Sequence, residues 1–245
     1  MQARFNRNTF PKLYPIVDAG LLAARSWNVA AFAAELRAAG VQMLQYRNKQ
    51  GSEQQLLQDT AAIRAIFSGT TTHLILNDRA DLLQQTRFHG VHIGQQDLAP
   101  EAARAIAGQQ AIVGVSTHTL EQMAAADATD CDYIAYGPVF ATASKANPDP
   151  VVGMEGLRAA RRVTSKPLVA IGGITRQNCR AVMAAGADSI AVISELFPRE
   201  GQSGATTVRQ IAEEFLALLA LRDTIFGQEL SSQREMMQPK CTGIR

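Results

Sequence analysis

The chain has little cysteine, and no spacing that would give its cysteines a structural use. Its 245 residues include three of them, Cys131, Cys179 and Cys241. They are too far apart for a zinc-binding pair, and an odd number does not complete a disulfide framework. Unpaired thiols are typical of a reducing compartment, so we expect a cytoplasmic protein.

The sequence also lacks an excess of charge, aromatic residues and long apolar runs. Its 24 basic residues against 22 acidic ones give a net charge of +2, and aromatic residues make up 6%. This balance argues against nucleic acid as a partner, because such surfaces need clustered basic side chains and aromatic rings. No run approaches the ~20 apolar residues of a membrane span, and the opening MQARFNRNTFPKLYP has no apolar signal-peptide core. Neither a membrane nor nucleic acid is therefore expected as a partner.

What the chain does have is 47% apolar residues arranged in a repeated alternation of short β-like runs and helical stretches. Eight strands are predicted, at Leu13–Val17, Gln42–Tyr46, His73–Leu76, Gly90–Ile93, Ile112–Val115, Tyr133–Tyr136, Leu168–Ile171 and Ser189–Ile193. Helices are predicted at Ala30–Ala39, Glu53–Phe67, Ala99–Ala107, Thr119–Asp127, Met154–Val163, Arg176–Ala185 and Thr207–Leu221. Strands that alternate with helices pair in parallel through right-handed crossovers, so the pattern predicts an α/β fold, a single (β/α)₈ TIM barrel.

An open, doubly wound sheet is the alternative architecture. The Gly-x-Gly-x-x-Gly fingerprint of dinucleotide-binding sheets is missing after the first strand, which favours the barrel. No linker or change of composition appears before about residue 223. We therefore assign residues 1–222 to one barrel domain and the polar, aperiodic residues 223–245 to a loosely held tail. Ser52 is a predicted helix N-cap, and Gly40, Gly108 and Gly186 occupy predicted C-cap positions.

Polar and glycine residues gather at the carboxyl ends of the predicted strands, where barrels of this type carry their active sites. The second strand delivers Gln45, Arg47 and Lys49 at alternate positions, which share one face of an extended chain. The later strands deliver, in order, Asn77 with Asp78, Asp97, Ser116, Thr142 with Ser144 and Lys145, Gly172 with Gly173, and Ile193 with Ser194. This concentration predicts a ligand site at that end of the barrel.

Two carboxylates stand out in this set, because Asp78 and Asp97 are separated by about one βα unit. They would lie on neighbouring strands, roughly 5 Å apart, where a carboxylate pair can bind Mg²⁺ together with a substrate phosphate. The alternative is that each aspartate caps the helix that follows it. Arg47, Lys49 and Lys145 are the cations opposite this pair, although Arg47 and Lys49 taken alone also fit a solvated strand edge. Together these charges favour a metal and a diphosphate.

A second anion site is predicted after the seventh and eighth strands. Gly172 and Gly173 would let backbone N–H groups approach a ligand, and loops at this position often bind phosphate. A tight turn is the alternative reading of the glycine pair. The sequence offers no recognisable Ser/His/Asp or Cys/His arrangement and no nucleophilic lysine. Structural or surface roles are assigned to its four histidines, His73, His89, His92 and His118.

The motifs at these strand ends resemble, in order, those of the thiamine phosphate synthase family. They are QYRNK at 45–49, LILNDRADL at 74–82, GVHIGQQDL at 90–98, VGVSTHT at 113–119, DYIAYGPVFATASK at 132–145, VAIGGIT at 169–175 and GADSIAVIS at 186–194. The resemblance spans residues 12–222. It implies a transferase of thiamine biosynthesis that joins 4-amino-2-methyl-5-hydroxymethylpyrimidine diphosphate to 4-methyl-5-(2-phosphoethyl)thiazole, with Mg²⁺ as cofactor. It also implies a possible homodimer.

The resemblance also implies a role for each site residue. The pyrimidine diphosphate falls on Gln45, Arg47, Lys49, Asn77, Ser116 and Lys145, of which Arg47, Lys49, Ser116 and Lys145 take part in catalysis. The thiazole phosphate falls on Thr142, Ser144, Gly173, Ile193 and Ser194. The metal falls on Asp78 and Asp97.

Some features depart from the family pattern. Ser144 replaces a threonine found in many relatives and keeps the hydroxyl. The first strand lacks the threonine that often precedes the family's aspartate, and Asp18 is assigned no role. A related thiazole tautomerase is a competing interpretation, but it carries a histidine where this chain has Pro138. Two more interpretations compete with the synthase: a sensor that binds thiamine phosphate without catalysis, and an aldolase- or isomerase-type barrel.

Overall fold

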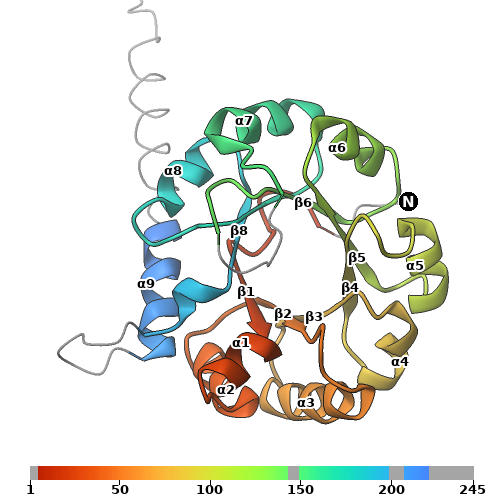
Figure 1. Cartoon of the computed structure of the whole chain (residues 1–245), viewed down its shortest axis with the longest axis vertical. Coiled ribbons are helices and arrows are strands. Elements are labelled where there is room, and N and C mark those ends of the chain that lie inside the picture. Colours follow the sequence, from red (N-terminus) through yellow and green to blue (C-terminus); the bar gives the residue numbers. More distant parts are fainter. Residues whose placement is uncertain (1–4, 143–148, 199–206, 221–245) are drawn as a thin grey trace, which may run out of the picture.

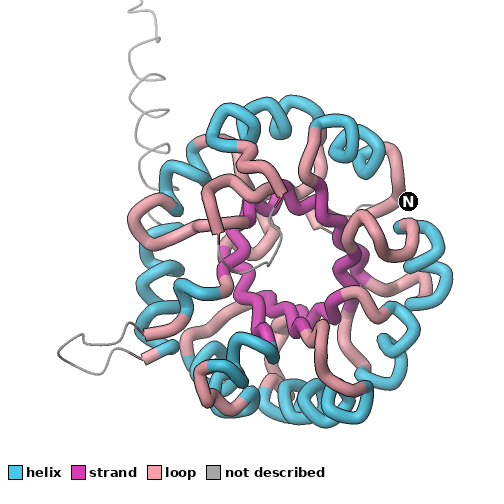
Figure 2. Tube along the Cα trace, in the orientation of Figure 1, coloured by secondary structure: helices cyan, strands magenta, loops and turns pink. Residues whose placement is uncertain are grey.

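A computed structural model describes residues 5–142, 149–198 and 207–220, which form a closed barrel (Figure 1). The eight strands pair in parallel and in chain order, and β8 returns to β1. Helices surround the strands as an outer ring, and loops join the two layers at both ends of the barrel (Figure 2). The predicted (β/α)₈ fold is confirmed.

The elements follow the predicted alternation. The strands are β1 (Leu13–Asp18), β2 (Met43–Arg47), β3 (His73–Asn77), β4 (Gly90–Ile93), β5 (Ile112–Thr117), β6 (Tyr133–Tyr136), β7 (Leu168–Ile171) and β8 (Ser189–Val192). The helices are α1 (Ala19–Ala24), α2 (Val29–Ala38), α3 (Glu53–Ile66), α4 (Leu83–Thr86), α5 (Pro100–Ala107), α6 (Leu120–Asp127), α7 (Gly153–Val163), α8 (Cys179–Ala184) and α9 (Val208–Ala220). Two short 3₁₀ turns, η1 (Ala80–Leu82) and η2 (Ser194–Leu196), complete the described set. Within that set, no helix has the length and apolar character needed to cross a membrane.

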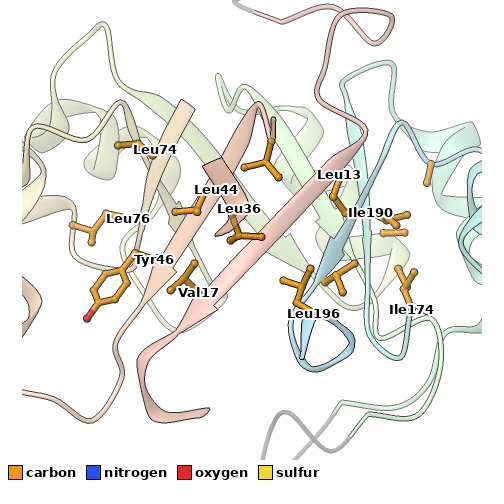
Figure 3. Packing of buried hydrophobic residues seen from close by; sticks show 14 of the residues in the cluster. Leu13, Val17, Leu36, Leu44, Tyr46, Leu74, Leu76, Ile174, Ile190 and Leu196 are labelled. Carbon is orange, nitrogen blue, oxygen red and sulfur yellow. The ribbon is translucent and has the colours of Figure 1, made fainter. Parts of the chain in front are cut away.

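The period of two along each strand divides the core into two layers. Outward-facing residues such as Leu13, Leu44 and Leu76 pack under the helices (Figure 3). Inward-facing residues such as Tyr14 and Met43 form a separate cluster inside the barrel. A side chain therefore reaches the inside of the barrel, and with it the site, only from every second strand position.

The N-terminal segment closes the barrel at the end opposite the strands' carboxyl termini. Phe10 packs on Tyr133 with the ring centres 5.3 Å apart, and Phe5 meets both Phe10 and His73 at 5.0 Å. Tyr133 and His73 are the first residues of their strands. These contacts fill one mouth of the barrel and leave the other for a ligand.

The predicted caps form as expected. The Ser52 hydroxyl accepts a hydrogen bond of 3.1 Å from the Gln55 N–H at the start of α3. Gly40, Gly108 and Gly186 have φ values of 80°, 100° and 116°, in the region where glycine avoids the steric cost of a side chain.

Most predicted bounds shift by one or two residues, and three larger differences concern one helix start and two short helices. Helix α8 begins at Cys179 rather than Arg176, because the Asn178 side chain accepts the Thr175 N–H at 2.8 Å and the residues between make a turn. Helix α1 was not predicted, although Asp18 caps it by accepting from the Leu21 N–H at 2.9 Å. The four-residue helix α4 was also missed, since it is too short to show helical periodicity. The predicted tail, residues 223–245, lies outside the described residues.

Candidate active site

A cavity opens at the carboxyl ends of the strands, and all eight strands contribute to its lining. Eight of the predicted site residues line it, namely Gln45, Arg47, Asn77, Ser116, Thr142, Gly173, Ile193 and Ser194. These residues come from segments spread over most of the chain, so the fold brings together what the sequence keeps apart. Lys49, Asp78 and Asp97 are not among the residues that line the cavity.

Polar side chains inside the barrel are linked by an unbroken series of hydrogen bonds. Gln45 donates its amide N–H to the Tyr14 hydroxyl at 3.0 Å, and the Tyr14 and Tyr133 hydroxyls are 2.8 Å apart. The Tyr133 hydroxyl lies 2.9 Å from His92 Nδ1, and His92 Nε2 lies 2.8 Å from Ser116 Oγ. The series crosses the barrel from β2 to β5, so the two predicted pyrimidine diphosphate ligands at its ends are physically connected.

Arg47 is held by a residue to which the sequence assigned no role. Its guanidinium forms an ion pair with the Asp18 carboxylate, the residue directly opposite it in the β1–β2 register. The other Asp18 oxygen caps helix α1 through Leu21. Asp18 therefore joins the first helix to a predicted catalytic arginine. The aspartate after the first strand, directly before a run of small and apolar residues, was the available signal.

The predicted metal ligands lie at the ends of β3 and β4, and a lysine from the end of β2 pairs with one of them. Lys49 Nζ is 2.9 Å from Asp78 Oδ2. Burial raises the pKa of Asp78 above its usual range, the Lys49 ammonium lowers it, and the neighbouring Asp97 carboxyl raises it. Two neighbouring carboxylates are thus accompanied by one ammonium. Within the described ranges, no group of three or more His, Cys, Asp or Glu side chains is positioned to hold a metal, so any metal here needs oxygens from water or substrate.

The helix-capping alternative for these two aspartates is wrong. The residues at the N-caps of η1 and α5 are Arg79 and Ala99, and neither helix receives a side-chain cap. Asp97 instead accepts the Gly94 N–H at 2.7 Å, which fixes its own turn after β4. Asp78 adopts a φ of 62°, a left-handed conformation that is uncommon outside glycine. Both carboxylates are therefore available at the strand ends and are not used by a helix.

The opposite side of the cavity is built from backbone. Gly172 and Gly173 have φ values of 99° and 62°. A Cβ on Gly172 would lie 2.4 Å from the Pro138 Cβ, and one on Gly173 would lie 2.6 Å from the Ala141 carbonyl oxygen. The loop after β6 follows these glycines closely, with the Phe140 N–H donating to the Gly172 carbonyl at 3.1 Å. The glycines form the turn and also admit this loop, which brings Thr142 to the cavity.

Two predicted residues on the same loop, Ser144 and Lys145, lie outside the described residues. The sequence analysis assigned structural or surface roles to the four histidines, but two of them, His92 and His118, line the cavity. His118 Nδ1 is 2.6 Å from the Gly137 carbonyl oxygen and its Nε2 is 3.4 Å from Asp149. His92 is buried and lines the cavity through the series of hydrogen bonds described above. An isolated histidine in the middle of a strand gave no sequence signal for this, because its partners come from β5 and β6.

Comparison with known proteins identifies the same family as the motifs do. A sequence model described as thiamine monophosphate synthase matches residues 13–196. The thiamine-phosphate synthase of Koribacter versatilis is 52% identical over 211 residues, which cover 85% of this chain and 96% of the relative. That of Chloroflexus aurantiacus is 39% identical over 183 residues, which cover 75% of this chain and 83% of the relative.

A solved structure extends the similarity to three dimensions. The thiamine phosphate pyrophosphorylase from Pyrococcus furiosus superposes with a TM-score of 0.75 at 30% identity, covering 88% of this chain and 98% of that one. Sequence and fold thus agree over nearly the whole length of these relatives, and the chain belongs to the thiamine monophosphate synthase family, as its motifs predicted.

Proposed function

We propose that this enzyme couples 4-amino-2-methyl-5-hydroxymethylpyrimidine diphosphate with 4-methyl-5-(2-phosphoethyl)thiazole to give thiamine phosphate and pyrophosphate. Thiamine phosphate synthesis is the activity of the family, and it makes the chain a transferase. The observation that supports these substrates is the two-sided cavity. Its β2–β5 side carries buried amide and hydroxyl groups next to paired charges, and its β6–β8 side offers glycine backbone and hydroxyls.

The pyrimidine diphosphate fits the β2–β5 side. Gln45 is only 2% exposed, and a buried amide requires hydrogen-bond partners. Tyr14 supplies one of them, and the ring edge of an aminopyrimidine would supply the others. Arg47 and Ser116 line the same cavity, where a guanidinium and a hydroxyl can bind phosphate oxygens. Lys49 and Lys145 would add positive charge around the diphosphate.

Mg²⁺ is the cation that fits Asp78 and Asp97. Their oxygens are hard ligands of the kind that Mg²⁺ prefers, and one or two carboxylates with substrate phosphate are its usual protein environment. The surroundings of the pair also fit, because the ammonium of Lys49 is the one described cation paired with these two carboxylates. When bound, the ion would neutralise negative charge on the diphosphate. Lys49 would then be released from Asp78 toward the phosphate oxygens.

The thiazole phosphate fits the β6–β8 side, at Thr142, Gly173, Ile193 and Ser194. Backbone N–H groups at a glycine turn and hydroxyl groups can hold a phosphate without bringing a charge of their own. Ser144 would join them from the loop after β6. The ring of the thiazole would then point toward the centre of the cavity, between the two anion sites.

The reaction requires no protein nucleophile in this arrangement. The bond between the pyrimidine methylene carbon and the diphosphate oxygen breaks, and the electron pair leaves on pyrophosphate. The electron-rich aminopyrimidine carries the positive charge, and the thiazole nitrogen forms the new carbon–nitrogen bond. Arg47, Lys49 and Lys145 would stabilise the charge that develops on the leaving group. The protein would otherwise contribute position, by holding the two rings in reacting geometry.

Pyrophosphate release from the purified protein tests the proposal. We expect release only when both substrates and Mg²⁺ are present, and none when EDTA replaces the metal. Release with a single substrate would point to hydrolysis and would contradict the coupling reaction. Binding of thiamine phosphate without any release would favour a sensor. A cytoplasmic location and a homodimer remain predictions, the first of them consistent with the two unpaired buried thiols Cys131 and Cys179.

A further inference from the structure

The hydrogen bonds inside the barrel form a series that ends on two substrate ligands but is built mostly from residues with no assigned role. We define the relay as Gln45, Tyr14, Tyr133, His92 and Ser116. We propose that the relay is proton-ordered, so that it presents Gln45 to the pyrimidine as an acceptor and Ser116 to the diphosphate as a donor. Tyr14, Tyr133 and His92 are then positioning residues. The proposal rests on the substrate placement described above.

The order follows from counting hydrogens along the relay. Gln45 Nε2 donates to the Tyr14 hydroxyl, which leaves the single Tyr14 hydrogen to donate onward to Tyr133. Tyr133 in turn donates to His92 Nδ1. A neutral imidazole that accepts at Nδ1 carries its hydrogen on Nε2, from which His92 donates to Ser116 Oγ. The Ser116 hydrogen is left to point at a ligand.

Burial keeps each tyrosine in the one-hydrogen form that this order requires. Tyr14 and Tyr133 are 1% and 0% exposed. The pKa of a tyrosine hydroxyl is ordinarily about 10, and burial raises the pKa of both hydroxyls above that range. Each hydroxyl therefore has one hydrogen to give and lone pairs to receive. If Ser116 is to donate to a ligand, His92 must donate to Ser116, Tyr133 to His92, Tyr14 to Tyr133, and Gln45 to Tyr14. The reverse order begins with Ser116 donating to His92.

The ligands distinguish the two orders. In the order described, Ser116 donates, and phosphate oxygens can only accept. Gln45, which gives one of its two amide hydrogens to Tyr14, offers its carbonyl oxygen to an amino group of the pyrimidine. In the reverse order Ser116 would spend its hydrogen on His92 and present only lone pairs to an anion. The requirement at the diphosphate end thus selects the amide orientation seen at the Gln45 end.

The barrel is shaped to hold the central tyrosine of the relay. A Cβ on Gly114 would lie 2.0 Å from Tyr133 Cζ, so only glycine at this point of β5 leaves space for the ring. The Tyr133 ring also stacks on His92, with their planes 23° apart. Tyr133 does not line the cavity. Its hydroxyl can therefore affect a ligand only through its neighbours.

The first test reads the proton order directly, without substrates. Two-bond ¹H–¹⁵N correlation spectra of uniformly ¹⁵N-labelled protein report the tautomer of each of the four histidines, and His92→Gln assigns the signal. We expect neutral His92 with its hydrogen on Nε2, and loss of that single tautomer in Tyr133→Phe. A hydrogen on Nδ1, or on both nitrogens at neutral pH, would overturn the proposal.

The second test asks whether the two ends are coupled. Gln45→Glu places an obligate acceptor at one end, which forces Tyr14 to donate to it and reverses the relay. We expect this change to weaken the binding of inorganic pyrophosphate with Mg²⁺, measured by calorimetry. The weakening should be about tenfold greater in the otherwise wild-type chain than in the Tyr133→Phe background, where the relay is already broken. Repulsion by the new carboxylate is common to both backgrounds and cancels in the comparison.

Tyr46→Phe supplies the matched background. It also removes a buried tyrosine hydroxyl, but that hydroxyl bonds to Asp59 on the helix side of β2. Gln45→Glu should weaken pyrophosphate binding as much in this background as in the wild type. Equal effects in all three backgrounds would overturn the relay. If wild-type protein bound no pyrophosphate, or if Ser116→Ala left its affinity unchanged, the substrate placement would fail and the proposal with it, whereas the tautomer would still be measured.

Discussion

The two sides of the cavity hold their ligand groups by different means. On the β2–β5 side, side chains fix one another, since Arg47 pairs with Asp18 of the neighbouring β1, and Asp78 pairs with Lys49. On the side formed by β6 to β8, the backbone does this work through the left-handed turn at Gly173 and the loop packed against it. One side is thus set by charge and the other by chain geometry.

This difference matches what each anion has to do in the proposed reaction. The diphosphate gains negative charge as it leaves, so opposing charges lower the barrier. The thiazole phosphate stays intact from substrate to product and needs only to be held in place. Charged groups that are already paired can exchange partners when the ligand arrives, whereas a glycine turn offers the same N–H groups throughout. Substitutions should therefore affect turnover on one side and affinity on the other.

The largest effect should come from the carboxylate pair. We expect Asp78→Asn to lower kcat by about a hundredfold or more, because it removes metal-assisted charge stabilisation worth several kcal/mol. It should also raise the Mg²⁺ concentration needed for half-maximal rate. The measurement is a Mg²⁺ titration of initial rates at saturating substrates.

Asp81→Asn is the control for this change. Asp81 lies three residues further along and is exposed, with its carboxylate paired to Arg79. It should leave both kcat and the Mg²⁺ requirement unchanged. If Asp78→Asn behaved like this control, the charged side of the cavity would not be the metal site.

On the backbone side, Gly173→Ala should raise the KM for the thiazole phosphate by about tenfold and change kcat much less. The added Cβ meets the Ala141 carbonyl oxygen at 2.6 Å, so the loop carrying Thr142 must move, and the positive φ adds about 1–2 kcal/mol of strain. Gly69→Ala is the matched control, because Gly69 has a φ of 75° with nothing within 4 Å of its added Cβ. Equal kinetics in the two variants would show that the glycine turn does not position this ligand.

A smaller effect is expected where the charged side meets the first helix. Asp18→Asn retains a good N-cap for α1 but removes the charge that orients Arg47. We expect kcat/KM for the pyrimidine diphosphate to fall by about tenfold or less, with no loss of stability. Asp18→Ala should show the same kinetic loss and also cost about 1 kcal/mol of unfolding free energy, from the missing cap. Faster turnover in Asp18→Asn would mean that Asp18 competes with the substrate for Arg47.

The sequence predicted the backbone frame and the residues at the strand ends because both depend on local rules. Side chains alternate between the two faces of a strand. Because Leu44 and Tyr46 face the helices, the side chain of Gln45 points inside the barrel. This alternation could not predict which side chains contact one another inside the barrel. The Asp18 contact with Arg47 depends on the β1–β2 register, and the space for Tyr133 depends on a glycine in the neighbouring strand. Neither spacing nor composition carries information of this kind.

The smallest effect lies away from both sides, at the closed end of the barrel, and it separates stability from catalysis. Burial lowers the pKa of both His73 and His89, so the folded chain binds fewer protons than the unfolded one below about pH 6.5. Their contribution to stability is therefore complete above that pH and is lost as the pH falls through the lowered pKa values.

His89→Gln keeps an acceptor for the Leu74 N–H but does not titrate. Urea unfolding between about pH 7 and pH 5 should give a flatter pH dependence for this variant than for the wild type, with kcat unchanged at neutral pH. An identical slope would place the acid sensitivity elsewhere, for example at the carboxylates of the site.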